Sequence, residues 1–166
     1  MQDSVKFIPY NQYSKGYIDI INRLNSDELS KKYLGSNLYN NIEYILRRNE
    51  EDVRNEFYII SYHNIFVGII SLTNRSKDDE QFEIDIGILL EYRKKGIAEK
   101  VSNIFIDYVF NNIESIDKLY FKIDYGNEAS VRLAEKQGLE LSDRNGSTFI
   151  YTKSREKMKD AISNKK

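Results

Sequence analysis

The chain contains no cysteine among its 166 residues, no tryptophan, one proline and one histidine, His63. The absence of cysteine excludes disulfides, thiolate nucleophiles and cysteine-ligated zinc. A catalytic triad or a metal site that used histidine would have to be built on His63 alone. Because His63 and Asn64 fall between two runs of strand-forming residues, we interpret them as a hairpin turn instead.

The sequence also lacks an excess of either charge, with 25 Lys and Arg against 26 Asp and Glu. We therefore expect no nucleic-acid partner, and any basic site must be local. No apolar run is long enough to span a membrane, and the first residues, "MQDSVKFIPY", lack the apolar segment of a signal peptide. These absences lead us to expect a cytoplasmic protein without a membrane partner.

What the chain does contain is typical of a globular protein. Hydrophobic residues make up 40% and charged residues 31% of the sequence, which is enough to bury a core. We see no repeat and no linker rich in glycine, serine or proline. We predict a single domain over residues 1–152, followed by a charged tail over residues 153–166.

The hydrophobic periodicity predicts alternating helical and strand segments. Helical spacing extends from Tyr13 to about Asn55, and a helix from Gly96 to Phe110 is expected to bury Val101, Ile104, Phe105 and Tyr108. Strand patterns occur in "FYIISY", "IFVGIISLT", "FEIDIGILL", "KLYFKID" and "TFIYT". A strand–helix–strand order over residues 82–124 predicts a parallel crossover, whereas the preceding hairpin is antiparallel. The sheet is therefore expected to be mixed.

The stretch "EYRKKGIAEKV" joins the third predicted strand to the long helix. The first turn of a helix offers backbone N–H groups and a partial positive charge, which together suit a phosphate. Gly96 would let the backbone approach such a ligand, Ala98 keeps the next turn uncrowded, and Arg93, Lys94 and Lys95 add positive charge. The spacing fits neither a Walker loop nor a dinucleotide fingerprint. An ordinary strand–helix junction with surface cations is the alternative.

Two motifs carry a family resemblance. The stretch Arg93-Lys94-Lys95-Gly96-Ile97-Ala98 resembles the R/Q-x-x-G-x-G/A signature of the GNAT superfamily of N-acetyltransferases. The segment "NEASVRLAEKQGLE", Asn127 to Glu140, is similar to the later N-x-x-[AS]-x-x-L-x-E-K-x-G-F block of that family. The resemblance covers about residues 57–152 and is strongest to the RimJ/RimL type, which also resembles spermidine acetyltransferases.

The resemblance implies a GNAT fold: a mixed, mostly antiparallel α/β sheet of six or seven strands with a splayed parallel pair, flanked by about four helices. It implies acetyl-CoA as co-substrate and no metal. In the family the signature loop holds the pyrophosphate, and strand backbone N–H groups contact the thioester and pantetheine. The implied cofactor-binding residues are Ile86, Ile88, Arg93, Lys94, Lys95, Gly96, Ile97, Ala98, Glu99, Asn127 and Ser130.

The implied reaction needs a base for the amine and an acid for the departing thiolate. Glu83 and Asp85 alternate with apolar residues on the third strand, and Glu83 is preferred because spermidine-type relatives carry a glutamate there. Many relatives have a tyrosine where this chain has Ala134, so Ser130 and Tyr125 become the candidate acids. Both carboxylates could instead be solvated or paired with cations. Ser130 could only cap its helix, and Tyr125 could only pack.

Two functions follow from the resemblance. The first is transfer of an acetyl group from acetyl-CoA to a primary amine of a small molecule or peptide, such as a protein N-terminus, a polyamine or an amino sugar. The second, which the missing tyrosine leaves open as the alternative, is a non-catalytic acyl-CoA-binding or sensor domain. A homodimer is compatible with either function.

Overall fold

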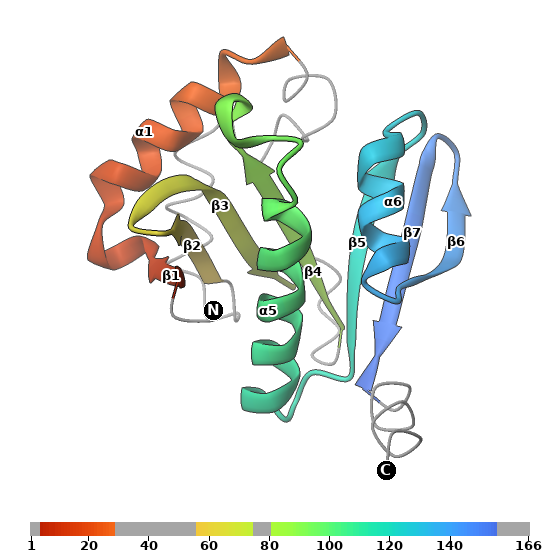
Figure 1. The fold of residues 1–166 in the computed structure, drawn as a ribbon. Coiled ribbons are helices and arrows are strands. Elements are labelled where there is room, and N and C mark those ends of the chain that lie inside the picture. The colour runs from red at the N-terminus through yellow and green to blue at the C-terminus, as the bar shows by residue number, and fades with distance from the viewer. Residues whose placement is uncertain (1–3, 29–55, 75–80, 156–166) are drawn as a thin grey trace. The chain divides into compact units, whose positions relative to one another are not determined.

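The computed structural model describes residues 4–28, 56–74 and 81–155, and Figure 1 shows the arrangement of its elements. The predicted helical segment over residues 29–55 lies outside the described residues. In chain order the elements are β1 (Val5–Pro9), η2 (Tyr10–Gln12), α1 (Ser14–Asn25), β2 (Glu56–Tyr62), β3 (Ile65–Thr73), β4 (Gln81–Ile88), η3 (Leu90–Tyr92), α5 (Ile97–Asn112), β5 (Lys118–Asp124), α6 (Glu128–Lys136), β6 (Glu140–Asn145) and β7 (Thr148–Ser154).

The strands form one mixed sheet of seven strands in the order β1-β2-β3-β4-β5-β7-β6. The β1–β2, β2–β3, β5–β7 and β6–β7 pairs are antiparallel. The β4–β5 pair is parallel, and its register matches Gln81 with Lys118, Phe82 with Leu119 and Glu83 with Tyr120. The prediction of a mixed, mostly antiparallel sheet is therefore confirmed. The polar strand β6 was not predicted.

The described chain divides into two compact units. The first consists of Met1–Thr73 and Asp85–Val101, and the second consists of Asn74–Ile84 and Ser102–Lys166. Strand β4 and helix α5 each contribute residues to both units. We describe each unit separately.

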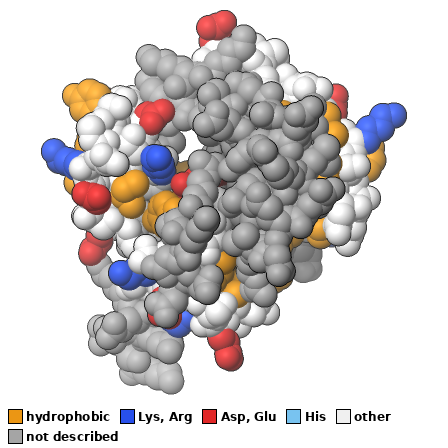
Figure 2. Space-filling view, turned by 180° about the vertical axis from the view of Figure 1, so that it is seen from behind, with side chains coloured by type: hydrophobic (Ala, Val, Ile, Leu, Met, Phe, Trp, Pro, Cys, Tyr) orange, Lys and Arg blue, Asp and Glu red, His pale blue; other side chains and the backbone are white. Residues whose placement is uncertain are grey.

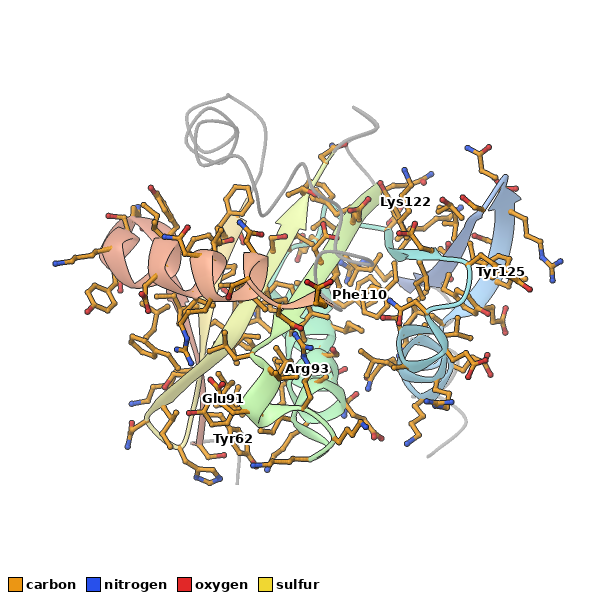
Figure 3. All side chains as sticks on the ribbon, turned by 90° about the horizontal axis from the view of Figure 1, so that it is seen from above. Tyr62, Glu91, Arg93, Phe110, Lys122 and Tyr125 are labelled. Carbon is orange, nitrogen blue, oxygen red and sulfur yellow. The ribbon has the colours of Figure 1, made fainter. Side chains whose placement is uncertain are left out.

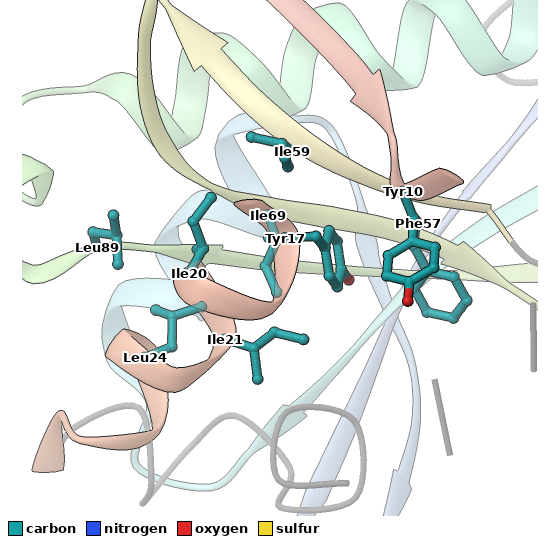
Figure 4. Packing of buried hydrophobic residues seen from close by; sticks show 9 residues of the cluster. All are labelled: Tyr10, Tyr17, Ile20, Ile21, Leu24, Phe57, Ile59, Ile69 and Leu89. Atoms are coloured by element: carbon teal, nitrogen blue, oxygen red, sulfur yellow. The ribbon is translucent and has the colours of Figure 1, made fainter. Parts of the chain in front are cut away.

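A buried hydrophobic cluster holds the first unit together. Helix α1 presents one face at the spacing of a helical turn, and that face packs on the sheet and on the residue that follows β4 (Figure 4). The rings of Tyr10 and Tyr17 meet edge to face, with centroids 5.3 Å apart. The members of the cluster are Tyr10, Tyr17, Ile20, Ile21, Leu24, Phe57, Ile59, Ile69 and Leu89.

The hairpin between β2 and β3 turns at His63 and Asn64, as predicted. Both residues have positive φ, 52° and 64°, and two-residue hairpin turns that match the strand twist need this conformation at both positions. Further along β3, a Cβ atom on Gly68 would lie 2.1 Å from the carbonyl oxygen of Gly87. Glycine at position 68 therefore allows the backbones of β3 and β4 to approach closely.

The second unit buries alternate residues of β5, namely Leu119, Phe121 and Ile123. The part of α5 that belongs to this unit buries Phe105, Ile106, Val109 and Phe110. The sequence prediction for α5 was partly wrong, because Tyr108 is 47% exposed. The helix is apolar over much of its circumference, so periodicity alone did not fix its buried face.

Other boundaries also differ from the prediction. The third predicted strand was expected to continue to Leu90, but β4 ends at Ile88 and a 3₁₀ turn, η3, follows it. Tyr92 N–H donates to the carbonyl of Leu89 at 2.9 Å, which closes this turn. The chain therefore bends before the glycine loop.

On the face drawn in Figure 2, the charged side chains of the described residues are scattered and carry both signs. None of the helices in the described ranges is long and apolar enough to cross a membrane.

Candidate functional site

The loop between β4 and α5 has an unusual backbone. Lys94 and Gly96 both have positive φ, 61° and 76°. Lys100 N–H donates to the carbonyl of Gly96 at 3.2 Å, which places the N–H groups of Ile97 and Ala98 ahead of the first bond of the helix. A Cβ atom on Gly96 would have nothing within 4 Å. The loop thus combines a helix N-terminus with open space over its glycine, which fits a phosphate group.

Cations surround this loop. Lys94 and Lys95 are exposed and Lys100 is half-buried. The Lys95 ammonium lies 6.0 Å from the ring centroid of Tyr92, and the Lys100 ammonium lies 5.6 Å from that of Tyr62. Aromatic faces at such distances attract a cation weakly, so these contacts leave the ammonium groups available to an anion.

Arg93, labelled in Figure 3, differs from these lysines because its guanidinium is bound to other groups of the protein. Its Nε donates to the carbonyl of Ile88 at 2.8 Å, and its Nη2 forms an ion pair with the carboxylate of Asp27. The side chains of Arg93 and Asp27 are 20% and 11% exposed. The neighbouring pair between Glu91 of the loop and Arg23 of α1 is about half exposed.

The candidate base lies on the first half of β4, in the second unit. Glu83 is only 3% exposed, and the parallel register sets it opposite Tyr120 of β5. Residues directly opposite in a sheet project to the same face, so the side chains of Glu83 and Tyr120 lie on one face of the sheet.

The alternative base, Asp85, lies in the first unit together with the half-buried Ile86 and the buried Ile88. Burial raises the pKa of Tyr17, and the negative charge of Asp85 raises it further, followed by Tyr10. Asp85 is thus close enough to Tyr17 to act on it electrostatically. The hydroxyl group of Tyr17 is buried and has no hydrogen-bond partner among the residues that the structure describes.

Two more buried hydroxyls lie on β3 of the same unit. Ser71 and Thr73 are 2% and 1% exposed, and within the described part of the chain neither hydroxyl has a hydrogen-bond partner. Strand alternation places both on the same face as Ile69, which belongs to the cluster beneath α1. The sheet face that α1 covers is therefore not purely apolar.

The junction between β5 and α6 brings together the other predicted residues. Asn127 caps α6, because its Oδ1 accepts a hydrogen bond from the backbone N–H of Ser130 at 3.3 Å. Ser130 is half-buried. Tyr125 is 73% exposed, and its ring meets that of Phe149 at a centroid distance of 5.8 Å. Ala134 is fully buried and has no proton to donate.

The sequence did not indicate Asp27, Tyr17 or Tyr120 as residues near these groups. Asp27 has no motif around it, and its contact with Arg93 is formed only by the folded chain. For Tyr17 a signal did exist, because Tyr17, Ile20, Ile21 and Leu24 have helical spacing. Within the described ranges, no group of three or more His, Asp or Glu residues could hold a metal ion.

Comparison with known proteins identifies the architecture. Residues 14–140 match the family model described as "Acetyltransferase (GNAT) domain". No curated protein sequence matches the chain significantly. Among solved structures, a chimera of the Vibrio cholerae spermidine N-acetyltransferase SpeG with hSSAT has a TM-score of 0.74 and 18% identity, covering 93% of this chain and 97% of its own.

Two further structures contain ligands. Campylobacter jejuni N-acetyltransferase PseH in complex with acetyl coenzyme A has a TM-score of 0.70 at 11% identity, and covers 90% of this chain and 98% of its own. Vibrio cholerae spermidine N-acetyltransferase in complex with CoA and spermine has a TM-score of 0.67 at 17% identity, with coverages of 93% and 98%. These likenesses establish the fold. Since the family model spans most of the sequence, the chain belongs to the GNAT acetyltransferases, enzymes that use acetyl-CoA as co-substrate.

Proposed function

We propose that this enzyme transfers the acetyl group of acetyl-CoA to a primary amine by direct attack on the thioester. The observation that carries the proposal is the loop before α5, where open space over Gly96 meets the helix N-terminus and exposed lysines. Such a loop can bind the pyrophosphate through the backbone N–H groups of residues 94–99, with Lys94 and Lys95 supplying positive charge. Asn127 and Ser130 are proposed as further cofactor contacts.

The chemistry assigns a role to each candidate residue. Glu83 removes a proton from the ammonium group, directly or through water, so that the neutral amine attacks the thioester carbonyl. Backbone N–H groups near Ile86 and Ile88 stabilise the negative charge that develops on the carbonyl oxygen. The carbon–sulfur bond then breaks, and the thiolate takes a proton from Ser130 or Tyr125. The new amide nitrogen loses its second proton to water, and water returns a proton to the acid.

The acceptor is the open part of this proposal. Spermidine is a candidate because the Vibrio cholerae structural neighbours are spermidine N-acetyltransferases. A peptide N-terminus and an amino sugar are the other two classes. The three buried hydroxyls beneath α1 do not by themselves select one of them.

A thiol-release assay with acetyl-CoA and one amine of each class tests the proposal. We expect release of CoA with at least one class, and a decrease of kcat by about 10²–10⁴-fold in Glu83→Gln with little change in CoA affinity. Asp85→Asn is the matched comparison and should have the smaller effect. A Glu83→Gln variant with the wild-type kcat at neutral pH would show that another group is the general base. CoA binding without turnover on any amine would support the alternative, a non-catalytic sensor domain.

A further inference from the structure

The contacts of Arg93 suggest a role other than binding the cofactor. A guanidinium group that binds a phosphate must direct its N–H donors toward that phosphate. In this structure Nε of Arg93 donates to the last residue of β4 at 2.8 Å, and Nη2 forms an ion pair with Asp27, just beyond α1. Both partners belong to the protein, and both side chains of the ion pair are largely buried.

The surrounding contacts support the same role. Leu89, the residue after β4, is buried in one cluster with Ile20 and Leu24 of α1. Arg93 N–H also donates to the carbonyl of Leu90 at 3.2 Å, which closes the turn η3. The loop is therefore tied to the end of β4, to its own turn and to the end of α1, immediately before the left-handed residues Lys94 and Gly96.

We infer that Arg93 is a positioning residue of the cofactor loop and that it acts through Asp27 and the Ile88 carbonyl rather than as a phosphate ligand. This inference rests on the proposed function, because it concerns the loop that would bind acetyl-CoA. Its electrostatic consequence is simple. Asp27 neutralises the charge of Arg93, so the attraction for phosphate comes from Lys94, Lys95 and the helix N-terminus.

The two roles predict opposite changes in CoA affinity when Asp27 loses its charge. If Arg93 binds phosphate, Asp27→Asn releases the guanidinium and removes a nearby negative charge, so CoA should bind more tightly. If Arg93 positions the loop, Asp27→Asn breaks a largely buried charged contact. CoA should then bind about tenfold more weakly, which corresponds to about 1.4 kcal/mol.

Calorimetric titration of CoA into Asp27→Asn, Arg93→Gln and the double variant provides the measurement. We expect each single variant to bind CoA about tenfold more weakly, and the double variant to bind no more weakly than Arg93→Gln, since both changes break one contact. Arg93→Lys should resemble Arg93→Gln, because an ammonium cannot replace the planar fork. Glu91→Gln is the matched control, because it removes a negative charge from the same loop at an exposed ion pair, and its affinity should stay within about twofold of wild type.

Tighter binding by Asp27→Asn than by Glu91→Gln would overturn the inference, as would near-wild-type binding by Arg93→Lys. Hydrogen exchange of residues 89–96 in the ligand-free protein gives a second, independent result. We expect faster exchange in Asp27→Asn and Arg93→Gln, and unchanged exchange would also overturn the inference. If the wild-type protein did not bind CoA, the proposed function would fail, while hydrogen exchange would still decide whether Arg93 fixes the loop.

Discussion

At the scale of single residues, two glycines form a natural comparison. Gly96 in the candidate cofactor loop and Gly146 in the turn between β6 and β7 both have positive φ, 76° and 63°. A Cβ atom at either position would have nothing within 4 Å. A substitution therefore causes similar backbone strain at both positions, about 1–2 kcal/mol, and only its position relative to the ligand differs.

We predict that Gly96→Glu weakens acetyl-CoA binding by at least about tenfold, through steric block and repulsion of the phosphates, which corresponds to about 1.4 kcal/mol. Both substitutions should lower the free energy of unfolding by a similar amount, because the backbone strain is similar. Gly146→Glu, however, should leave CoA affinity unchanged. Calorimetry and thermal unfolding of both variants check this. Equal CoA affinities for the two variants would show that this loop does not bind acetyl-CoA.

The proton donor is a second prediction at this scale. One lost hydrogen bond to a developing anion costs about 1.5–3 kcal/mol, so Ser130→Ala and Tyr125→Phe should each slow turnover by about tenfold to a hundredfold at most. The variant with the larger effect identifies the acid, and both should still bind acetyl-CoA. A double variant with the wild-type rate would mean that the thiolate leaves without assistance.

The residues also show what the sequence could and could not predict. The positive charge of the loop was readable from Arg93, Lys94 and Lys95, because they are consecutive. The engagement of Arg93 by Asp27 was not readable, because the two residues lie far apart in the sequence and only the fold brings them together. Likewise, alternation placed Glu83 opposite the apolar face of its strand, but its burial depends on what covers that second face.

At the scale of elements, strand β6 could not be predicted from the hydrophobic pattern of the sequence. Its sequence, "ELSDRN", is polar throughout, and every residue is exposed. No alternation indicates a strand there. The strand exists because it pairs with β7 across the turn at Gly146, and such cross-strand pairing overrides a weak local preference. The cap of α6, by comparison, needs only Asn127 and Ser130, which are three residues apart.

At its C-terminal end, helix α5 is held by hydrogen bonds from Arg155. Arg155, just after β7, donates from Nε to the carbonyl of Ile116 at 3.0 Å and from Nη2 to that of Ile113 at 2.7 Å. It also donates from Nη1 to the carbonyl of Phe110 at 2.5 Å, and its guanidinium lies 5.2 Å from the centroid of the Phe110 ring. One cation thus binds the carbonyl groups at the end of α5 and just after it, where a positive charge is favourable.

We predict that Arg155→Ala lowers the free energy of unfolding by about 2–4 kcal/mol, because several charge-assisted hydrogen bonds and partly buried carbonyls lose their donor. Arg132→Ala is the control, since its ion pair with Glu128 spans 3.9 Å on the exposed surface of α6 and should contribute less than about 0.5 kcal/mol. Urea unfolding of both variants gives the comparison. Similar losses would mean that the contacts of Arg155 contribute little to stability.

At the scale of the whole molecule, stability should depend on pH through Tyr17. Burial, then Asp85, then Tyr10 raise the pKa of Tyr17 in the folded state above its ordinary value of 10.0. The unfolded chain therefore releases this proton at lower pH than the folded chain does. The contribution of Tyr17 to the free energy of unfolding is fully present below about pH 10. It decreases as pH rises further, by about 1.4 kcal/mol per pH unit.

We predict that Tyr17→Phe removes this part of the alkaline loss of stability. At neutral pH the variant should be as stable as wild type or more stable by about 1 kcal/mol, because a buried hydroxyl without a partner is costly. Unfolding free energies measured between pH 7 and about pH 11 test both statements. A variant that loses stability with pH as steeply as wild type would show that Tyr17 ionises in the folded state.

The fold class of the molecule was predictable for a physical reason. The strand–helix–strand order over residues 82–124 specifies a parallel crossover in a mixed sheet, and the two short motifs at residues 93–98 and 127–140 carry the resemblance to the GNAT fold. The amine acceptor was not predictable, because no motif in the sequence indicates its class, and the buried polar groups Tyr17, Ser71 and Thr73 emerge only in the folded chain. In the sequence these residues look like ordinary core or strand positions.

His63 gives the protein a use in spectroscopy. As the sole histidine, it contributes one set of imidazole signals to an NMR spectrum, which need no assignment by mutation. Its ring lies 4.3 Å from that of Tyr62, so the ring current of Tyr62 sets its chemical shift. The ammonium group of Lys100, in the first turn of α5, lies 5.6 Å from the centroid of the same Tyr62 ring. The wild-type protein therefore carries its own reporter for events at the start of that helix.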